Sequence, residues 1–195
     1  MTLSAGTRLG PYEIVAQLGV GGMGEVYKAS DTRLGRTVAI KILHQASENL
    51  RERFEREARV VAALQHPHIC TLFDIGNHDG MDYLVMEYLE GQTLQCPLPL
   101  AKVLEYGMQI SDALGAAHQK GVTHRDLKPA NVMITRTGAK LLDFGIAKLN
   151  DVKCPGPDDP TLTQALTAGG TLIGTLPYMA PEQLEGKQAD PRSDI

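Results

Sequence analysis

Short runs of alternating hydrophobic and polar residues dominate the first part of the chain, and Gly, Asp and Asn residues separate them. This alternation predicts β-strands joined by turns. The predicted strands cover residues 12–18, 25–29, 37–43, 70–74 and 83–87. The chain therefore begins with a β-rich unit.

One segment of this unit, residues 47–65, has hydrophobic residues at helical spacing. Glu57 lies inside its apolar arc, where an unpaired carboxylate would be costly to bury. We therefore expect a cation from elsewhere in the fold to meet Glu57. The apolar positions of this predicted amphipathic helix are Leu50, Phe54, Ala58, Val61 and Leu64.

The pattern becomes helical after Gly91, and Gly121 is a suitable stop for the predicted helix. Short strands are predicted at 132–134 and 140–142, whereas residues 150–174 are rich in Pro, Gly and Thr without periodicity and predict a long loop. The fold class is therefore α+β. The apolar residues that recur at steps of three and four are Leu100, Val103, Leu104, Ile110, Leu114 and Ala117.

Composition narrows the classes of function. The 195 residues suit one domain or two small lobes, and a net charge of −4 argues against nucleic acid or an anionic membrane as the main partner. No apolar run reaches the ~18 residues of a membrane helix or resembles a signal peptide. Three cysteines without C-x-x-C spacing favour a reducing compartment. We expect a cytoplasmic protein without a membrane segment.

The sequence His-Arg-Asp-Leu-Lys-Pro-Ala-Asn at 124–131 is followed by Asp-Phe-Gly at 143–145. Asp126 could accept a hydroxyl proton, Lys128 adds positive charge, and Asn131 and Asp143 offer the oxygen ligands that Mg²⁺ prefers. This combination favours phosphoryl transfer.

A G-x-G-x-x-G motif occupies residues 19–24, and a β-like segment follows it. A dinucleotide-binding loop would open a helix, so a Rossmann-type oxidoreductase is disfavoured and a hairpin that covers phosphates is favoured. A hairpin that merely needs positive φ remains the alternative.

Lys41 interrupts an apolar strand, and an ammonium there needs a counter-ion. We predict an ion pair between Lys41 and Glu57 that holds the lysine against the nucleotide phosphates. Read separately, Lys41 could protect a strand edge and Glu57 could be solvated.

These motifs, in this order, resemble bacterial serine/threonine protein kinases of the eukaryotic type from residue 12 to residue 195. The resemblance implies a two-lobed fold with an N-lobe at 1–88 and an incomplete C-lobe at 89–195. It implies transfer of the γ-phosphate of ATP, with Mg²⁺ or Mn²⁺, to Ser or Thr hydroxyls of protein substrates. The catalytic residues that it implies are Asp126, Lys128, Asn131 and Thr175, and the metal ligands are Asn131 and Asp143.

The resemblance also implies a nucleotide site in which Met86 is the gatekeeper and the segment from Glu87 to Leu89 is the hinge. In the loop that follows Asp-Phe-Gly, a phosphothreonine would pair with Arg125, and autophosphorylation is expected. The implied ATP-binding residues are Leu18, Gly19, Val20, Gly21, Gly22, Met23, Gly24, Val26, Ala39, Lys41, Glu57, Glu87, Leu89 and Met133. The candidate acceptors are Thr161, Thr163, Thr167 and Thr171.

Some positions depart from the family pattern. Only Gln95 and Cys96 stand where a short helix usually follows the hinge, and Thr123 replaces an aliphatic residue. The sequence stops just after Asp194, the counterpart of the aspartate that steadies the His-Arg-Asp loop, so the helices beyond Ile195 are expected to be missing. Apolar surface on the helix over Leu104–Ala117 would then stay exposed. The alternative function is a nucleotide-binding or regulatory fragment without turnover.

Overall fold

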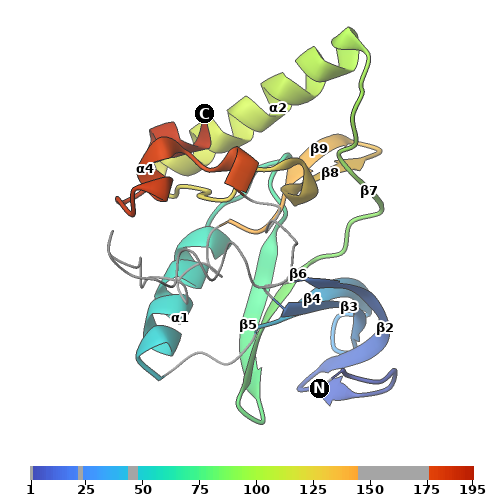
Figure 1. The fold of residues 1–195 in the computed structure, drawn as a ribbon. Coiled ribbons are helices and arrows are strands. Elements are labelled where there is room, and N and C mark those ends of the chain that lie inside the picture. Colours follow the sequence, from blue (N-terminus) through green and yellow to red (C-terminus); the bar gives the residue numbers. More distant parts are fainter. Residues whose placement is uncertain (1, 22–23, 44–47, 145–175) are drawn as a thin grey trace, which may run out of the picture.

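The computed structural model describes residues 2–21, 24–43, 48–144 and 176–195. A large antiparallel sheet with one helix forms the N-terminal lobe, and a long helix with a small sheet forms most of the second lobe (Figure 1). The segment after β6 joins the two lobes.

The large sheet has the order β1-β2-β3-β4-β6-β5. The five strands predicted in this region are confirmed, although the predicted 70–74 strand begins at Leu72 and is longer. The two-residue strand β1 was not predicted, because so short a run carries no alternation. The strands are β1 Arg8–Leu9, β2 Tyr12–Gly21, β3 Gly24–Asp31, β4 Arg36–Ile42, β5 Leu72–His78 and β6 Met81–Glu87.

The two faces of this sheet have different partners. On one face Tyr27, Val38, Ile40 and Val85 have no exposed surface and form a compact cluster. Each such side chain stabilises the fold by about 1.5–3 kcal/mol through burial. On the other face the register places Val26 opposite Lys41, so the strand lysine faces the rest of the molecule.

Helix α1, Glu48–Ala62, covers the sheet beside β5 (Figure 1). The predicted apolar arc is confirmed for the residues whose side chains are described, because they join the core that α1 shares with the second lobe. These buried residues are Phe54, Ala58, Val61 and Leu64.

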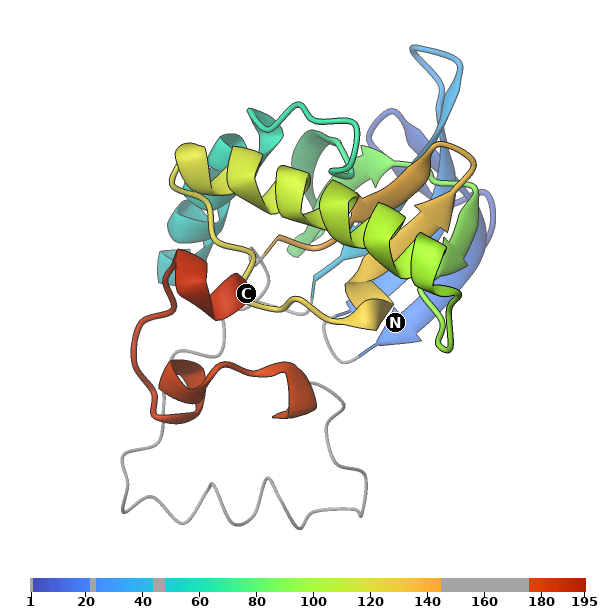
Figure 2. The ribbon, with the colours of Figure 1, turned by 90° about the horizontal axis from the view of Figure 1, so that it is seen from above.

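The second lobe is built on α2, Leu100–Gln119, which lies along the small sheet (Figure 2). Gln109 Oε1 accepts a hydrogen bond of 2.8 Å from the backbone N–H of Ala139 in this sheet. The helix ends where predicted, with Gly121 at a φ of 72°. The small sheet has the order β7-β8-β9 and consists of β7 Gly91–Thr93, β8 Val132–Thr135 and β9 Gly138–Leu141. Shorter elements are η1 Pro129–Asn131, η3 Leu176–Tyr178, α4 Pro181–Leu184 and η4 Pro191–Asp194.

Burial along α2 is uneven. Ala113, Leu114 and Ala117 are buried near its C-terminal end. Towards its start, apolar side chains lie open to solvent; the predicted exposure is therefore seen at Leu104 and Met108 but not at the C-terminal end. Their exposed fractions are 72% for Leu100, 49% for Val103, 59% for Leu104 and 69% for Met108. Within the described ranges, no helix combines the length and the apolar character that a membrane span requires.

Candidate active site

The loop at 124–131 connects the end of α2 to β8 and turns through η1. Lys128 Nζ lies 2.9 Å from Asp126 Oδ2. The Asn131 amide nitrogen donates to the same oxygen at 3.0 Å and to the Asp126 carbonyl oxygen at 2.8 Å. Asp126 and Asn131 are both buried. An ammonium and an amide therefore orient a single carboxylate, and the three predicted residues lie together.

Asp194 anchors the start of this loop from η4. Its Oδ2 accepts hydrogen bonds from the His124 backbone N–H at 2.7 Å and lies 2.8 Å from His118 Nε2. Its Oδ1 accepts from the Arg125 backbone N–H at 2.8 Å. The predicted steadying contact is therefore present. It holds Arg125 in a left-handed backbone conformation with a φ of 65°.

His124 connects the loop to the strand that leads to Asp143. Its side chain is fully buried, and its Nε2 lies 2.8 Å from the Leu142 carbonyl oxygen. The Asp126 backbone N–H donates to Nδ1 at 3.3 Å, which fixes a neutral ring protonated on Nε2. Burial lowers the pKa of His124 below its ordinary value, in agreement with this assignment.

Two further contacts complete this unit. The Leu142 backbone N–H donates to the Asn131 carbonyl oxygen at 2.9 Å. The rings of His124 and Phe144 have centroids 4.8 Å apart, and both rings are buried. Asp126, Asn131 and Asp143 thus belong to one hydrogen-bonded and packed assembly.

The strand lysine has a different partner from the one predicted. Lys41 Nζ forms an ion pair of 2.8 Å with Asp143 Oδ2. Glu57 Oε2 lies instead 4.0 Å from Arg125 Nη1. The predicted Lys41–Glu57 pair is therefore wrong for this structure. The reason is that Asp143, at a φ of 54°, brings a nearer carboxylate beneath β4.

The glycine-rich segment forms the predicted hairpin, with β2 and β3 paired from Tyr12 and Asp31 to Gly21 and Gly24. Gly24 has a φ of +132°, and a Cβ there would lie 1.9 Å from the Ile42 carbonyl oxygen. Only glycine fits this close approach. Leu18 and Val20 are exposed on the hairpin.

The predicted walls of the nucleotide site come from both sheets. The register pairs Val26 with Lys41 and Ala39 with Met86, so these four share one face of the large sheet. Met133 is half-buried on β8 of the small sheet. Gly19 and Gly21 lie on β2, and Glu87 and Leu89 are half-buried at the connection between the lobes.

Glu87 has a partner that the sequence analysis missed. Lys140 Nζ on β9 lies 2.7 Å from Glu87 Oε2 and 2.9 Å from Oε1. A usable signal was present, because Lys140 interrupts a short apolar strand in the same way as Lys41. The contact between His118, near the end of α2, and Asp194 was not predicted either.

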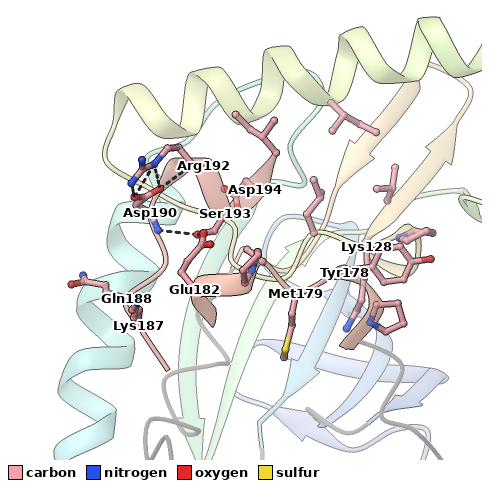
Figure 3. A pocket seen from close by; sticks show the side chains of 18 of the residues that line it. Lys128, Tyr178, Met179, Glu182, Lys187, Gln188, Asp190, Arg192, Ser193 and Asp194 are labelled. Carbon is pink, nitrogen blue, oxygen red and sulfur yellow. Dashed lines mark hydrogen bonds and ion pairs between the residues drawn. The ribbon is translucent and has the colours of Figure 1, made fainter. Parts of the chain in front are cut away.

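A cavity of about 930 Å³ lies beside the 124–131 loop, between residues 127–132 and 177–195 (Figure 3). Lys128 lines it from the loop. Across from Lys128, the Glu182 carboxylate accepts a hydrogen bond from the Ser193 hydroxyl. Gln183 Nε2 donates to the Arg125 carbonyl oxygen at 2.9 Å and ties this wall to the loop.

Several predicted residues lie outside the described ranges. They are Gly22, Met23, Thr161, Thr163, Thr167, Thr171 and Thr175.

The family profile for the protein kinase domain matches residues 12–195. The chain belongs to the protein kinase family. Its kinase relatives include serine/threonine-protein kinase Pkn2 of Myxococcus xanthus, 40% identical over 95% of this chain and 23% of that protein. They also include serine/threonine-protein kinase PknD of Mycobacterium tuberculosis, 42% identical over 97% of this chain and 28% of that protein.

The kinase fold is confirmed by solved structures. The crystal structure of the Mycobacterium tuberculosis PknI kinase domain superposes with a TM-score of 0.75 at 33% identity and is matched over 100% of this chain and 73% of that one. The chain thus spans about a quarter of the length of the curated kinases it matches. Membership of this family implies the use of ATP and a divalent metal ion.

Proposed function

We propose that the protein transfers the γ-phosphate of ATP to Ser or Thr hydroxyls of proteins. The observation that carries this proposal is the Asp126 carboxylate, which Lys128 and Asn131 orient inside a unit bonded to the strand before Asp143. Phosphoryl transfer depends almost entirely on positioning and on stabilising charge, so a rigid arrangement of this kind is what the reaction requires.

Each loop residue receives a role under this proposal. Asp126 accepts the proton of the substrate hydroxyl, and Lys128 stabilises charge on the transferred phosphoryl group. The nitrogen of the Asn131 amide is already bonded to Asp126, so its oxygen is the atom suited to a metal ion. Thr175 would contact Asp126.

The residues present fit a divalent cation. Asp143 and Asn131 provide two hard oxygen ligands, which suits Mg²⁺ because this ion keeps water and phosphate ligands in its shell. Mn²⁺ accepts the same oxygen ligands and is the second choice. When bound, the cation would neutralise phosphate charge, and both residues would hold it.

ATP would lie between the two sheets. Leu18, Val26, Ala39 and Met133 would contact the base, and the backbone from Glu87 to Leu89 would pair with it. The glycine-rich hairpin, including Gly22 and Met23, would cover the phosphates that Lys41 faces.

Regulation by autophosphorylation is part of this proposal. Arg125 now lies near Glu57, and a phosphate on Thr161, Thr163, Thr167 or Thr171 would offer this guanidinium a stronger partner. Phosphopeptide mapping after incubation with Mg-ATP tests it. Modification at Ser4 or Ser47 alone would count against it.

We place the protein in the cytoplasm and expect protein rather than nucleic acid substrates. The net charge of −4 and the odd number of cysteines support these two assignments.

The test of transfer uses radiolabelled ATP and a generic basic protein. Asp126→Asn should reduce incorporation by at least about 10²-fold, since it removes the proton acceptor. Asp112→Asn is the matched control, because that carboxylate is 72% exposed and lies 3.2 Å from the His66 ring, away from the 124–131 loop. Equal incorporation by wild type and Asp126→Asn would refute the catalytic assignment. Thermal stabilisation of the wild type by ATP without any transfer would instead favour a regulatory nucleotide-binding role.

A further inference from the structure

Lys140 and Glu87 form an ion pair in which both carboxylate oxygens take part. The ammonium lies 2.7 Å from Oε2 and 2.9 Å from Oε1, and the exposed fractions of the side chains are 13% for Lys140 and 28% for Glu87. An ion pair this sheltered restricts both side chains far more than a surface pair does.

The pair connects the two lobes at the point where the chain passes between them. Glu87 is the last residue of β6 in the large sheet, and Lys140 belongs to β9 in the small sheet. In the sequence they are 53 residues apart. β9 is itself fixed in the second lobe, because it pairs with β8 and its Ala139 N–H donates a hydrogen bond to Gln109 of α2.

Hydrogen bonds with Cys70 and Thr71 also hold Glu87 in place. Its N–H donates to the Thr71 carbonyl oxygen at 2.9 Å, and the Thr71 N–H donates to Glu87 Oε2 at 3.3 Å. The Cys70 thiol lies 3.7 Å from the Glu87 carbonyl oxygen. Burial raises the pKa of this thiol to about 12, so it stays protonated and donates.

Lys140 directs its charge at Glu87 and not at a ligand, so its effect is to fix the position of Glu87. Its ammonium is directed at Glu87, and Glu87 begins the segment whose backbone faces the base under the proposed function. A carbonyl that is displaced by a fraction of an ångström loses the alignment on which a hydrogen bond to a base depends.

We propose that Lys140 is a positioning residue for ATP, which acts through Glu87 to fix the backbone that recognises the adenine base. The inference rests on the proposed function. If it is correct, the loss of the pair will weaken the binding of the base more than the binding of the phosphates. A purely structural ion pair would change thermal stability and leave ligand preference unaltered.

The experiment measures dissociation constants of Mg-ATP, Mg-GTP and inorganic tripolyphosphate with Mg²⁺ by titration calorimetry. Lys140→Met keeps the apolar stem and removes the charge, and Glu87→Gln neutralises the partner without changing its size. Lys140→Arg restores a cation that can engage both oxygens. Lys102→Met is the matched control, because Lys102 forms a 2.8 Å pair with Glu105 on the exposed surface of α2.

We expect Lys140→Met to weaken Mg-ATP binding about 10-fold or more and tripolyphosphate binding less than about 2-fold, with a lower preference for ATP over GTP. Glu87→Gln should behave in the same way, and the double variant should be no worse than either single one, since both remove one interaction. Lys140→Arg should recover most of the affinity. Lys102→Met should bind like the wild type.

Mg-ATP affinities within about 2-fold of wild type in both Lys140→Met and Glu87→Gln would overturn the inference and leave the proposed function standing. If Lys140→Met does not fold, Glu87→Gln decides alone by the same criterion. Failure of the wild type to bind Mg-ATP would instead overturn the proposed function, and the inference with it.

Discussion

Replacing Asp194 by alanine should lower the free energy of unfolding by about 3–5 kcal/mol. The side chain has no exposed surface and accepts from three donors, at 2.7 Å from the His124 backbone, 2.8 Å from the Arg125 backbone and 2.8 Å from His118. Each hydrogen bond to a charged group contributes about 1.5–3 kcal/mol. The three share one carboxylate, so their contributions will not add fully.

Asparagine provides a graded test at the same position. An amide has one accepting oxygen, so in either orientation its NH₂ group faces one of the backbone N–H groups of His124 or Arg125. One buried donor is then left unsatisfied, and the expected loss is about 1–3 kcal/mol.

Urea denaturation followed by circular dichroism measures these changes, since the chain has no tryptophan for fluorescence. Asp112→Asn is the matched control. It also removes a carboxylate 3.2 Å from a histidine Nε2, but at a side chain that is 72% exposed, so it should cost less than about 1 kcal/mol. If Asp194→Ala lost no more stability than Asp112→Asn, the carboxylate would not be the anchor of the 124–131 loop.

Three other variants or conditions have defined outcomes. Burial lowers the pKa of His124, so below about pH 6.5 the unfolded chain binds more protons than the folded one. The free energy of unfolding should therefore fall by up to about 1.4 kcal/mol for each pH unit below that pH. Urea titrations at pH 7.5 and 5.5 should show a smaller fall for His124→Gln than for the wild type. Iodoacetamide at pH 8 should alkylate the exposed Cys96 and leave the partly buried Cys70 unmodified, because desolvation raises the pKa of the Cys70 thiol to about 12. Equal labelling of both cysteines in peptide mass spectrometry would contradict this difference. Gly24→Ala should lose about 2 kcal/mol or more in urea titrations, because a Cβ would lie 1.9 Å from the Ile42 carbonyl oxygen, and unchanged stability would show that the hairpin can relax.

Much of the fold could be predicted because the relevant signals are local. Alternation marks the strands of the large sheet, and the three- and four-residue spacing marks both long helices. Strands β1 and β7 are too short to show a period. Their existence depends on pairing with strands that are already in place.

The site could be predicted residue by residue but not contact by contact. Lys41 and Glu57 were identified as charges in apolar surroundings that need partners, and the sequence alone cannot choose among the available carboxylates and cations. The actual partner of Lys41 is Asp143, which reaches it only because the chain brings the residues after β9 close to β4 in the folded protein. The contacts of His118 with Asp194 and of Lys140 with Glu87 span 76 and 53 residues, and no local pattern reports such distances.

Under the proposed function, the salt bridge between Lys41 and Asp143 would make the binding of nucleotide and the binding of metal ion thermodynamically dependent on each other. Phosphates that attract the ammonium would leave the carboxylate without its counter-charge, and a divalent ion on the carboxylate would release the ammonium. Each ligand therefore removes the obstacle to the other. By reciprocity, nucleotide and metal ion would then raise each other's affinity by the same factor.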